Sequence, residues 1–408
     1  MKKTVMRSYA KLIVRVGANV QKGQEVRVFA SLDQPEFIKM LAEECYKAGA
    51  SRVTVDWNYP ELTKLSARYM KLRDLSETRE WEKARMQDMV DHLPVRIFIE
   101  SEDPDGLRGI NPKYFKAFAA RIKISKPYRD AIDNKHQWCI AAVPGEAWAK
   151  KVHPELSKRA AVEQLWKDIL YTARADGEDP IADWEEHNRD LKARSKYLND
   201  LHLRELRYHS ANGTDFKVGL IPTAEFHAGR DKTMQGVVYD PNMPTEEVFT
   251  SPDRARAEGI VYSAMPLVHA GQIVRDFWLR FEAGRVVDFG AEQGAEVLRH
   301  IIETDDNSCR LGECALISKN TPIRQSETLF FDTLYDENAS CHLALGMGFP
   351  ECLEGGVNLG KEELLARGVN QSVAHVDFMI GTDDLNVWGV CEDGTEVPVF
   401  ENGQWAWE

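Results

Sequence analysis

Two ionisable residues, His375 and Asp377, stand two positions apart in the apolar run VAHVDFMIG. Residues two apart on a β-strand project to the same face, so the imidazole and the carboxylate lie side by side while Val376 and Phe378 face a core. Ionisable groups in so apolar a run need compensation, and a metal ion held by a histidine and a carboxylate supplies it. A hydrogen-bonded His–Asp pair that orients a loop is the alternative, and these residues alone leave both open.

Further acidic and imidazole residues occur in short motifs of the second half of the chain. They are Glu246 and Glu247 in NMPTEEVFTSP, Glu313 in RLGECALIS, and Asp336, Glu337 and His342 in FDTLYDENASCHLALGMGF. Each motif also has a purely structural interpretation. Glu246 and Glu247 could lie in a first helical turn after Thr245, and Glu313 could form a salt bridge at a strand end. Asp336 and Glu337 could belong to a tight turn, and His342 could be a core histidine with a backbone partner. Taken singly, none of these signals is specific.

Taken together, the residues form a set of ligands for two divalent cations that share carboxylates. The proposed ligands are Glu247, Glu313, His342, His375 and Asp377. Their three carboxylates offset most of the positive charge of two such ions, and a bridging hydroxide would neutralise the rest. Glu337 is then available as a general base that takes a proton from the bridging water and passes it to the leaving group. The set predicts a dinuclear hydrolytic centre.

The elements that must position these residues differ between the two halves of the chain. The first half alternates strand-like and helix-like segments, which predicts crossover connections and a largely parallel sheet. After Leu203, short β-like runs are separated by turn signals at Asn212-Gly213, Asp393-Gly394 and Asn402-Gly403, which are typical of antiparallel hairpins. We therefore predict an N-terminal largely parallel α/β domain (residues 1–190) and an antiparallel-rich α+β metal-binding catalytic domain (residues 191–408).

Composition narrows the function classes. The 408 residues suit two domains, and the net charge of −13 argues against nucleic acid as a partner, since phosphate contacts need clustered Lys and Arg. No window approaches ~18 apolar residues, and Lys11 and Arg15 interrupt any signal-peptide core, so we expect no membrane partner. Seven cysteines, an odd number with no CxxC pair, indicate reduced thiols and a cytoplasmic location.

The ordered motifs resemble the M29 metallo-aminopeptidases, the aminopeptidase T group. The resemblance is carried by NMPTEEVFTSP, DFWLRFEAGRVVDFGAEQG, RLGECALIS, FFDTLYDENASCHLALG, AHVDFMIG and EDGTEVPVFENGQWA, and in the first half by RVGANVQKGQEV, AAVPGEAWAKKVHPEL and EDPIADWEEHNRDL. It covers essentially the full chain. It implies a hydrolase that releases N-terminal residues from short peptides with a free N-terminus, and a homodimer with an enclosed active-site chamber.

The resemblance also implies roles for individual residues. The family's metal ligands correspond to Glu247, Glu313, His342, His375 and Asp377, which would hold two divalent ions (Zn, Co or Mn), and its catalytic glutamate corresponds to Glu337. The motif alignment selects Glu247 over Glu246. The sequence departs from the family at Phe349, where family members carry a tyrosine seven residues after the first metal-site histidine.

Two other functions fit part of the pattern. His342, His375 and Asp377 can form the facial triad of a mononuclear Fe(II) ring-cleaving dioxygenase, and some such enzymes resemble the same fold family. That function leaves Glu247 and Glu313 without a role, whereas two metals use both. A binding module with a structural metal site is the non-enzymatic alternative, but structural zinc sites are usually closed by four protein ligands and this set leaves ligands to spare.

Overall fold

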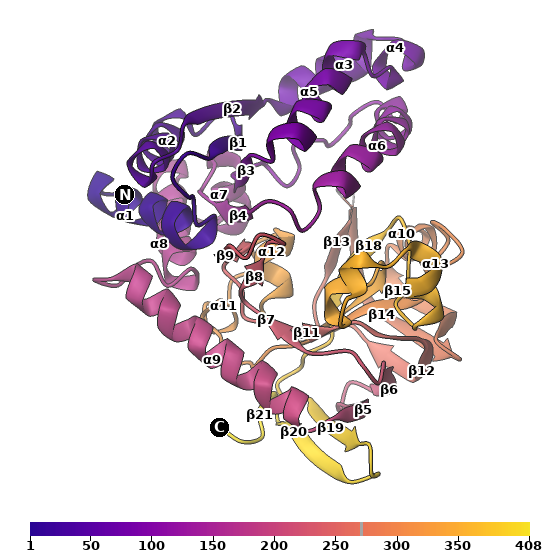
Figure 1. Ribbon diagram of the computed structural model, residues 1–408. Helices are drawn as coiled ribbons and strands as arrows, with labels where there is room; N and C mark the ends of the chain where they lie inside the picture. The colour runs from indigo at the N-terminus through magenta and orange to yellow at the C-terminus, as the bar shows by residue number, and fades with distance from the viewer. Residues whose placement is uncertain (270–271) are drawn as a thin grey trace. The chain divides into compact units, whose positions relative to one another are not determined.

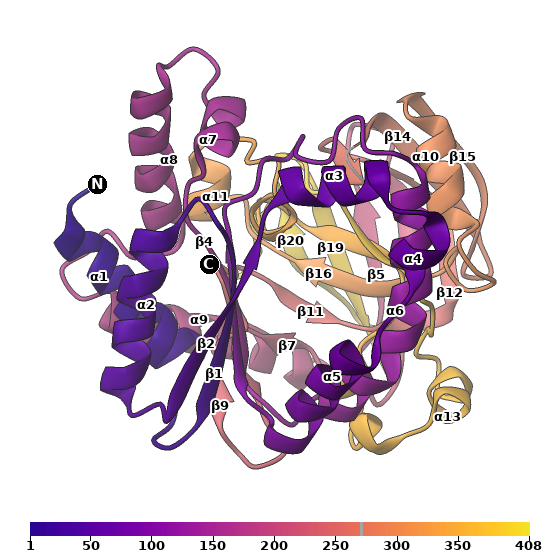
Figure 2. The same ribbon diagram turned by 90° about the horizontal axis from the view of Figure 1, so that it is seen from above.

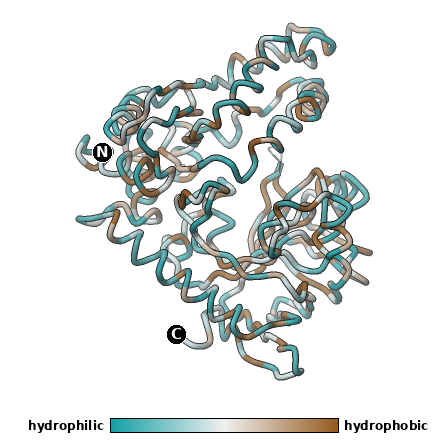
Figure 3. Tube along the Cα trace, in the orientation of Figure 1, coloured by the Kyte–Doolittle hydropathy of each residue, from teal (hydrophilic) through white to brown (hydrophobic). Residues whose placement is uncertain are grey.

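The computed structural model describes residues 1–269 and 272–408, which divide into two compact units (Figure 1). Unit 1 comprises residues 1–185 and 230–244, and unit 2 comprises residues 186–229 and 245–408. The chain passes from one to the other within α9 (Pro180–Asp200), a mostly hydrophilic helix (Figure 3). Among the described residues, no helix has the length and apolar character needed to cross a membrane.

Unit 1 is built on a parallel sheet with strand order β10-β4-β3-β1-β2. One face is apolar and buried, with Val28 on β1 in register with Ile97 on β3, while the other carries the stacked rings of Phe29 and Phe98. Figure 2 shows how helices flank this sheet. The elements are α1 (Lys3–Leu12), a π-helical turn (Ile13–Gly17), β1 (Glu25–Ser31), α2 (Pro35–Ala48), β2 (Arg52–Asn58), α3 (Pro60–Tyr69), α4 (Leu72–Ser76), α5 (Glu80–His92), β3 (Val95–Glu100), α6 (Lys113–Ile132), β4 (Trp138–Ala142), α7 (Glu146–Val152), α8 (Lys158–Thr172), β8 (Asp231–Lys232), β9 (Val238–Tyr239) and β10 (Asn242–Met243).

The segment 230–244 packs with unit 1, although the sequence-based division at residue 190 placed it in the second domain. Its strand β10 pairs with β4 in parallel, and the Ile140 N–H donates to the Pro241 carbonyl oxygen at 2.7 Å. The division into residues 1–190 and 191–408 stays a prediction about which parts of the chain fold independently.

Unit 2 contains a large antiparallel sheet with order β13-β14-β12-β6-β5-β19-β20-β21, and β15 pairs with β14. Asn212-Gly213 connects β5 to β6, and Asp393-Gly394 connects β19 to β20, as the turn signals predicted. Its elements are β5 (Leu203–His209), β6 (Asp215–Leu220), β12 (Pro252–Tyr262), β13 (Leu267–His269), β14 (Gln272–Glu282), β15 (Arg285–Gln293), β19 (Asn386–Cys391), β20 (Glu396–Glu401), β21 (Gln404–Trp405) and the helix α10 (Ala295–Ile302).

A second antiparallel sheet of unit 2, here called the site sheet, has the order β18-β17-β16-β11-β7. Its strands are β7 (His227–Ala228), β11 (Val248–Thr250), β16 (Leu311–Leu316), β17 (His342–Gly346) and β18 (His375–Met379), and the short helices α11 (Pro322–Gln325), α12 (Thr333–Glu337) and α13 (Lys361–Ala366) lie in its connections. A parallel α/β part and antiparallel sheets are thus both present, so the predicted fold class is confirmed.

One face of the site sheet belongs to the core of unit 2. Leu343, Leu345 and Phe378 are buried there in one cluster with side chains of the large antiparallel sheet. The rings of Phe277 and Phe378 join the two sheets, with centroids 5.9 Å apart. Because successive strand residues alternate between faces, burying these residues turns their sequence neighbours to the opposite face.

Candidate metal centre

The strand register brings the predicted ionisable residues to one face of the site sheet. Ala344 on β17 lies opposite Glu313 on one side and Asp377 on the other, and Gly346 lies opposite His375. Paired residues of antiparallel strands share a face. His342, two residues before Ala344, therefore joins Glu313, His375 and Asp377, all of them opposite the apolar core face.

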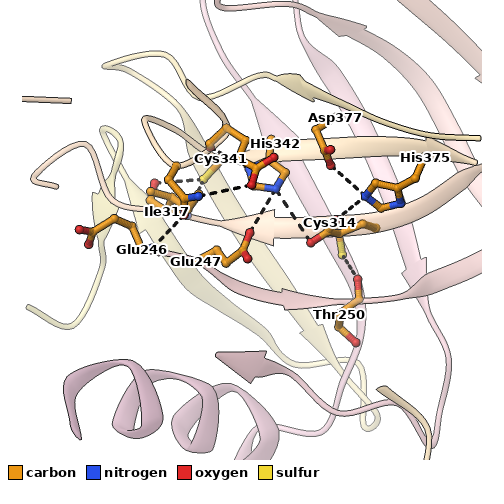
Figure 4. A network of polar contacts seen from close by, with 12 residues as sticks. Glu246, Glu247, Thr250, Cys314, Ile317, Cys341, His342, His375 and Asp377 are labelled. Atoms are coloured by element: carbon orange, nitrogen blue, oxygen red, sulfur yellow. Dashed lines mark hydrogen bonds and ion pairs between the residues drawn. The ribbon is translucent and has the colours of Figure 1, made fainter. Parts of the chain in front are cut away.

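The side chains converge into two groups that share Glu313. The ligand atoms of Glu247, Glu313 and His342 lie within 4.8 Å of one another, as do those of Glu313, His375 and Asp377. His342 Nε2 is 3.4 Å from Glu247 Oε2 and 3.9 Å from Glu313 Oε1. His375 Nε2 is 3.2 Å from Glu313 Oε2 and 3.1 Å from Asp377 Oδ1 (Figure 4). Glu313 thus presents one oxygen to each histidine, the arrangement that a carboxylate bridging two cations needs.

Backbone carbonyls orient both imidazoles. His342 Nδ1 donates to the Glu337 carbonyl oxygen at 2.9 Å, and His375 Nδ1 donates to the Met347 carbonyl oxygen at 2.8 Å. The second carbonyl is placed by a close approach at Gly312, where a Cβ would lie 2.0 Å from Met347 O. Metal-binding histidines commonly donate their other ring N–H in this way, which directs Nε2 to the ligand position.

The centre holds buried carboxylates that no Lys or Arg neutralises within the described part of the chain. The ion pairs of Glu247, Glu313 and Asp377 are all with the two histidines. Burial raises the pKa of Glu313 to about 7, assisted by the charge of Glu247. Burial would also raise the pKa of Asp377, but the charge and hydrogen bond of His375 outweigh it and hold that pKa below the usual value.

For the two histidines, burial and the neighbouring negative charges shift the pKa in opposite directions. Burial would lower the pKa of His342, but the Glu247 hydrogen bond and the charges of Glu313, Glu247 and Asp377 raise it to about 10. For His375, Asp377 and Glu313 likewise overcome burial and raise the pKa well above its usual value. Imidazole nitrogens and carboxylate oxygens in this number are donors that suit divalent transition metals, so the residues present fit such ions.

Glu337 lies beside the two ligand groups and belongs to neither. It ends α12, and burial, followed by the charges of Asp377 and Glu247, raises its pKa well above the usual value. Its neighbour Asn338, which the sequence analysis did not single out as a site residue, ties this helix to the Glu247 segment. Asn338 Oδ1 accepts the Glu246 N–H at 2.8 Å, while its Nδ2 donates to the Leu334 carbonyl oxygen at 2.8 Å.

Glu246 is not brought into the centre. Residues 245–247 lead into β11 without forming a helical turn, so adjacent side chains point apart. Figure 4 shows Glu246 directed away from Glu247, and its Oε2 lies 4.0 Å from His187 Nε2. Asp336 is also outside both groups. Its carboxylate accepts the N–H groups of Phe330 at 2.9 Å and Asp332 at 3.2 Å and so anchors α12.

Comparisons with known proteins agree with a metalloprotease. A family model described as thermophilic metalloprotease (M29) matches residues 2–405. Aminopeptidase 2 of Geobacillus stearothermophilus is 40% identical over 98% of this chain and 97% of its own length, and Aminopeptidase AmpS of Bacillus subtilis (strain 168) is 40% identical over 98% of each chain. The solved structure of wild-type AmpT from Thermus thermophilus superposes with a TM-score of 0.92 at 37% identity, covering 99% of both chains.

The chain therefore belongs to the M29 metalloprotease family. The enzyme class predicted from the sequence, a hydrolase of the metallo-aminopeptidase type, is confirmed. A dihydroxypyridine dioxygenase from Pseudomonas putida KT2440 shares only the fold, with a TM-score of 0.50 at 13% identity over 99% of this chain and 96% of its own.

Proposed function

We propose that the enzyme releases N-terminal residues from short peptides with a free N-terminus, at a dinuclear centre of Zn, Co or Mn ions with a bridging water and Glu337 as general base. The observation that carries this proposal is the double orientation of Glu313, whose two oxygens face different histidines and complete two three-ligand groups. Glu247, Glu313 and His342 would hold one ion, and Glu313, His375 and Asp377 the other.

Bound divalent ions would polarise the scissile carbonyl and lower the pKa of water to about 7. Glu337 is suited to move the proton. Its raised pKa favours the protonated form after it has taken a proton from the attacking water, and the buried acid can then pass that proton to the departing amine. Asn338 and the Glu337 carbonyl bond to His342 hold this base in a set position relative to the ligands.

The donor set of the centre supports a preference for a free N-terminus. Glu247, Glu313, Glu337 and Asp377 converge with no Lys or Arg pairing among the described residues. Two divalent ions and a bridging hydroxide would neutralise the three ligand carboxylates, so the free amine of the substrate would bind as a neutral donor to one ion, and an acetylated amine is a poor donor.

A mononuclear dioxygenase would use only His342, His375 and Asp377. It would leave Glu247 and Glu313 buried beside the metal without a role, which is costly for ionisable groups.

We further propose a cytoplasmic homodimer without nucleic-acid or membrane partners. The free cysteines, of which Cys391 is half-buried and the other described ones are buried, and the net charge of −13 support this proposal.

The experiment is metal analysis of the purified protein combined with a panel of aminoacyl p-nitroanilides after reconstitution with Zn²⁺, Co²⁺ or Mn²⁺. We expect about two ions per chain and hydrolysis of substrates with a free amine but not of their N-acetyl forms. One iron per chain with no amidase activity would contradict the proposal. Light scattering during size-exclusion chromatography tests the dimer.

A further inference from the structure

Two phenylalanines from distant parts of unit 2 meet beside the centre. Phe249 follows Glu247 by two residues on β11, and Phe349 lies in the loop after β17. Their ring centroids are 5.3 Å apart in an edge-to-face arrangement, and the Phe349 ring is 5.1 Å from the His375 ring. Both phenylalanines are half-buried, so part of each ring stays accessible.

The aromatic pair lies on the face of the site sheet that carries the ligands. Phe249 pairs in register with Ala315, two residues after Glu313, so the three side chains share this face. In the strand registers Ala344 stands between Glu313 and Asp377, and Ala315 stands between Phe249 and His342. The His375 side chain is 28% exposed, whereas that of His342 is 1% exposed. The centre is therefore more accessible on the His375 side, where Phe349 stands.

The backbone holds Phe349 in place. Its N–H donates to Ser251 Oγ at 2.7 Å, and the Ser251 hydroxyl lies 3.4 Å from the Phe349 carbonyl oxygen. Ser251 is fully buried at the end of β11, two residues beyond Phe249. This hydrogen bond ties the Phe349 backbone to the residue that follows β11, two positions after Phe249.

We infer that Phe249 and Phe349 form an apolar wall that receives the side chain of the substrate's N-terminal residue and makes the enzyme prefer large apolar residues there. The inference rests on the proposed aminopeptidase function. The centre would hold the free amine of the substrate, and the adjacent rings can then contact the side chain on the same Cα. Phe349 carries no hydroxyl, so the wall offers neither charge nor a strong hydrogen-bond donor to a polar side chain.

The test compares Leu-, Ala- and Asn-p-nitroanilide, because Asn is similar to Leu in size but polar. A single methylene group in an apolar pocket discriminates substrates by about 10- to 200-fold. In the metal-loaded wild type we expect kcat/KM to be highest for Leu. In Phe249→Ala and in Phe349→Ala the Leu-to-Ala ratio should fall about tenfold, mainly through KM, with metal content unchanged.

Matched variants separate this role from a structural one. Phe289 is also half-buried in unit 2 but lies on β15 under the Arg299 guanidinium, so Phe289→Ala should keep the wild-type ratios. Phe349→Leu keeps an apolar surface and should retain most of the Leu preference, which preserves the test if Phe349→Ala does not fold.

Unchanged ratios in the Ala variants, or an equal loss for all three substrates, would overturn the inference while leaving the aminopeptidase proposal intact. A metal-loaded wild type that cleaves none of the substrates would overturn both.

Discussion

Metal binding to the chelated enzyme should release protons, because the ligands neutralise one another when no cation is bound. With its pKa raised to about 10, His342 is protonated at pH 7, and so is His375, whose pKa is raised well above its usual value by Asp377 and Glu313. Glu313, with a pKa of about 7, is then about half protonated. All three must lose their protons to act as ligands.

The expected release at pH 7 is therefore about 2.5 protons per chain, and Glu337 adds up to one more if the cations displace its proton. Because their pKa values are raised, the ligands carry protons at neutral pH that the metal ions must displace. Metal affinity should therefore increase with pH. The slope of log K against pH should fall from about 3 at pH 6, where Glu313 is mostly protonated, to about 2 at pH 8, where it is mostly ionised.

The assay is titration calorimetry of Zn²⁺ into chelated protein at one pH in buffers of different ionisation enthalpy, which yields the proton count directly. His300→Ala, on an exposed histidine of α10, should release the wild-type number of protons, whereas His375→Ala should give little heat of Zn²⁺ binding. Release of fewer than one proton at pH 7 would refute the assignment of the imidazoles as protonated partners that become ligands.

Three further predictions address the same residues. Glu337→Gln should retain both metals and lower kcat by a factor on the order of 100 to 10,000, and near-normal turnover would dismiss Glu337 as the base. His375→Ala should lose metal and activity together in metal analysis and p-nitroanilide assays, and a fully loaded variant would show that His375 is not a ligand. In chelated protein the folded chain binds more protons than the unfolded chain, because the pKa values of Glu313 and His342 are raised to about 7 and about 10. Its Tm should accordingly fall as pH rises. The stabilisation from Glu313 should be lost between pH 4.5 and 7, and that from His342 between pH 6.5 and 10. A Tm that increases over this range would contradict the charge balance of the centre.

Local sequence patterns indicated several of the elements and the types of residue proposed for the centre. The alternation around His375 and Asp377 indicated a strand with both on one face, and β18 has that form. Asn212-Gly213 indicated a hairpin, which connects β5 and β6. Such signals are readable because periodicity and turn chemistry depend on near neighbours in the chain.

The assembly of the centre was decided by contacts between distant segments. Whether Glu246 or Glu247 faces the histidines depends on how residues 245–247 enter β11, and the double orientation of Glu313 depends on the registers of β16 with β17 and of β17 with β18. Cross-strand register is set by packing of the opposite face against the core, so it is not encoded by any one strand.

Sequence alone therefore determined the enzyme family and the alternation of strands and helices in the first half, and it predicted the ligand residues, since each resides in short contiguous motifs. Only the tertiary structure decided that residues 230–244 return to pair with β4, and that Phe249 and Phe349 meet beside His375. The physical reason is that these contacts join segments about a hundred residues apart, and their geometry is the outcome of packing the whole unit.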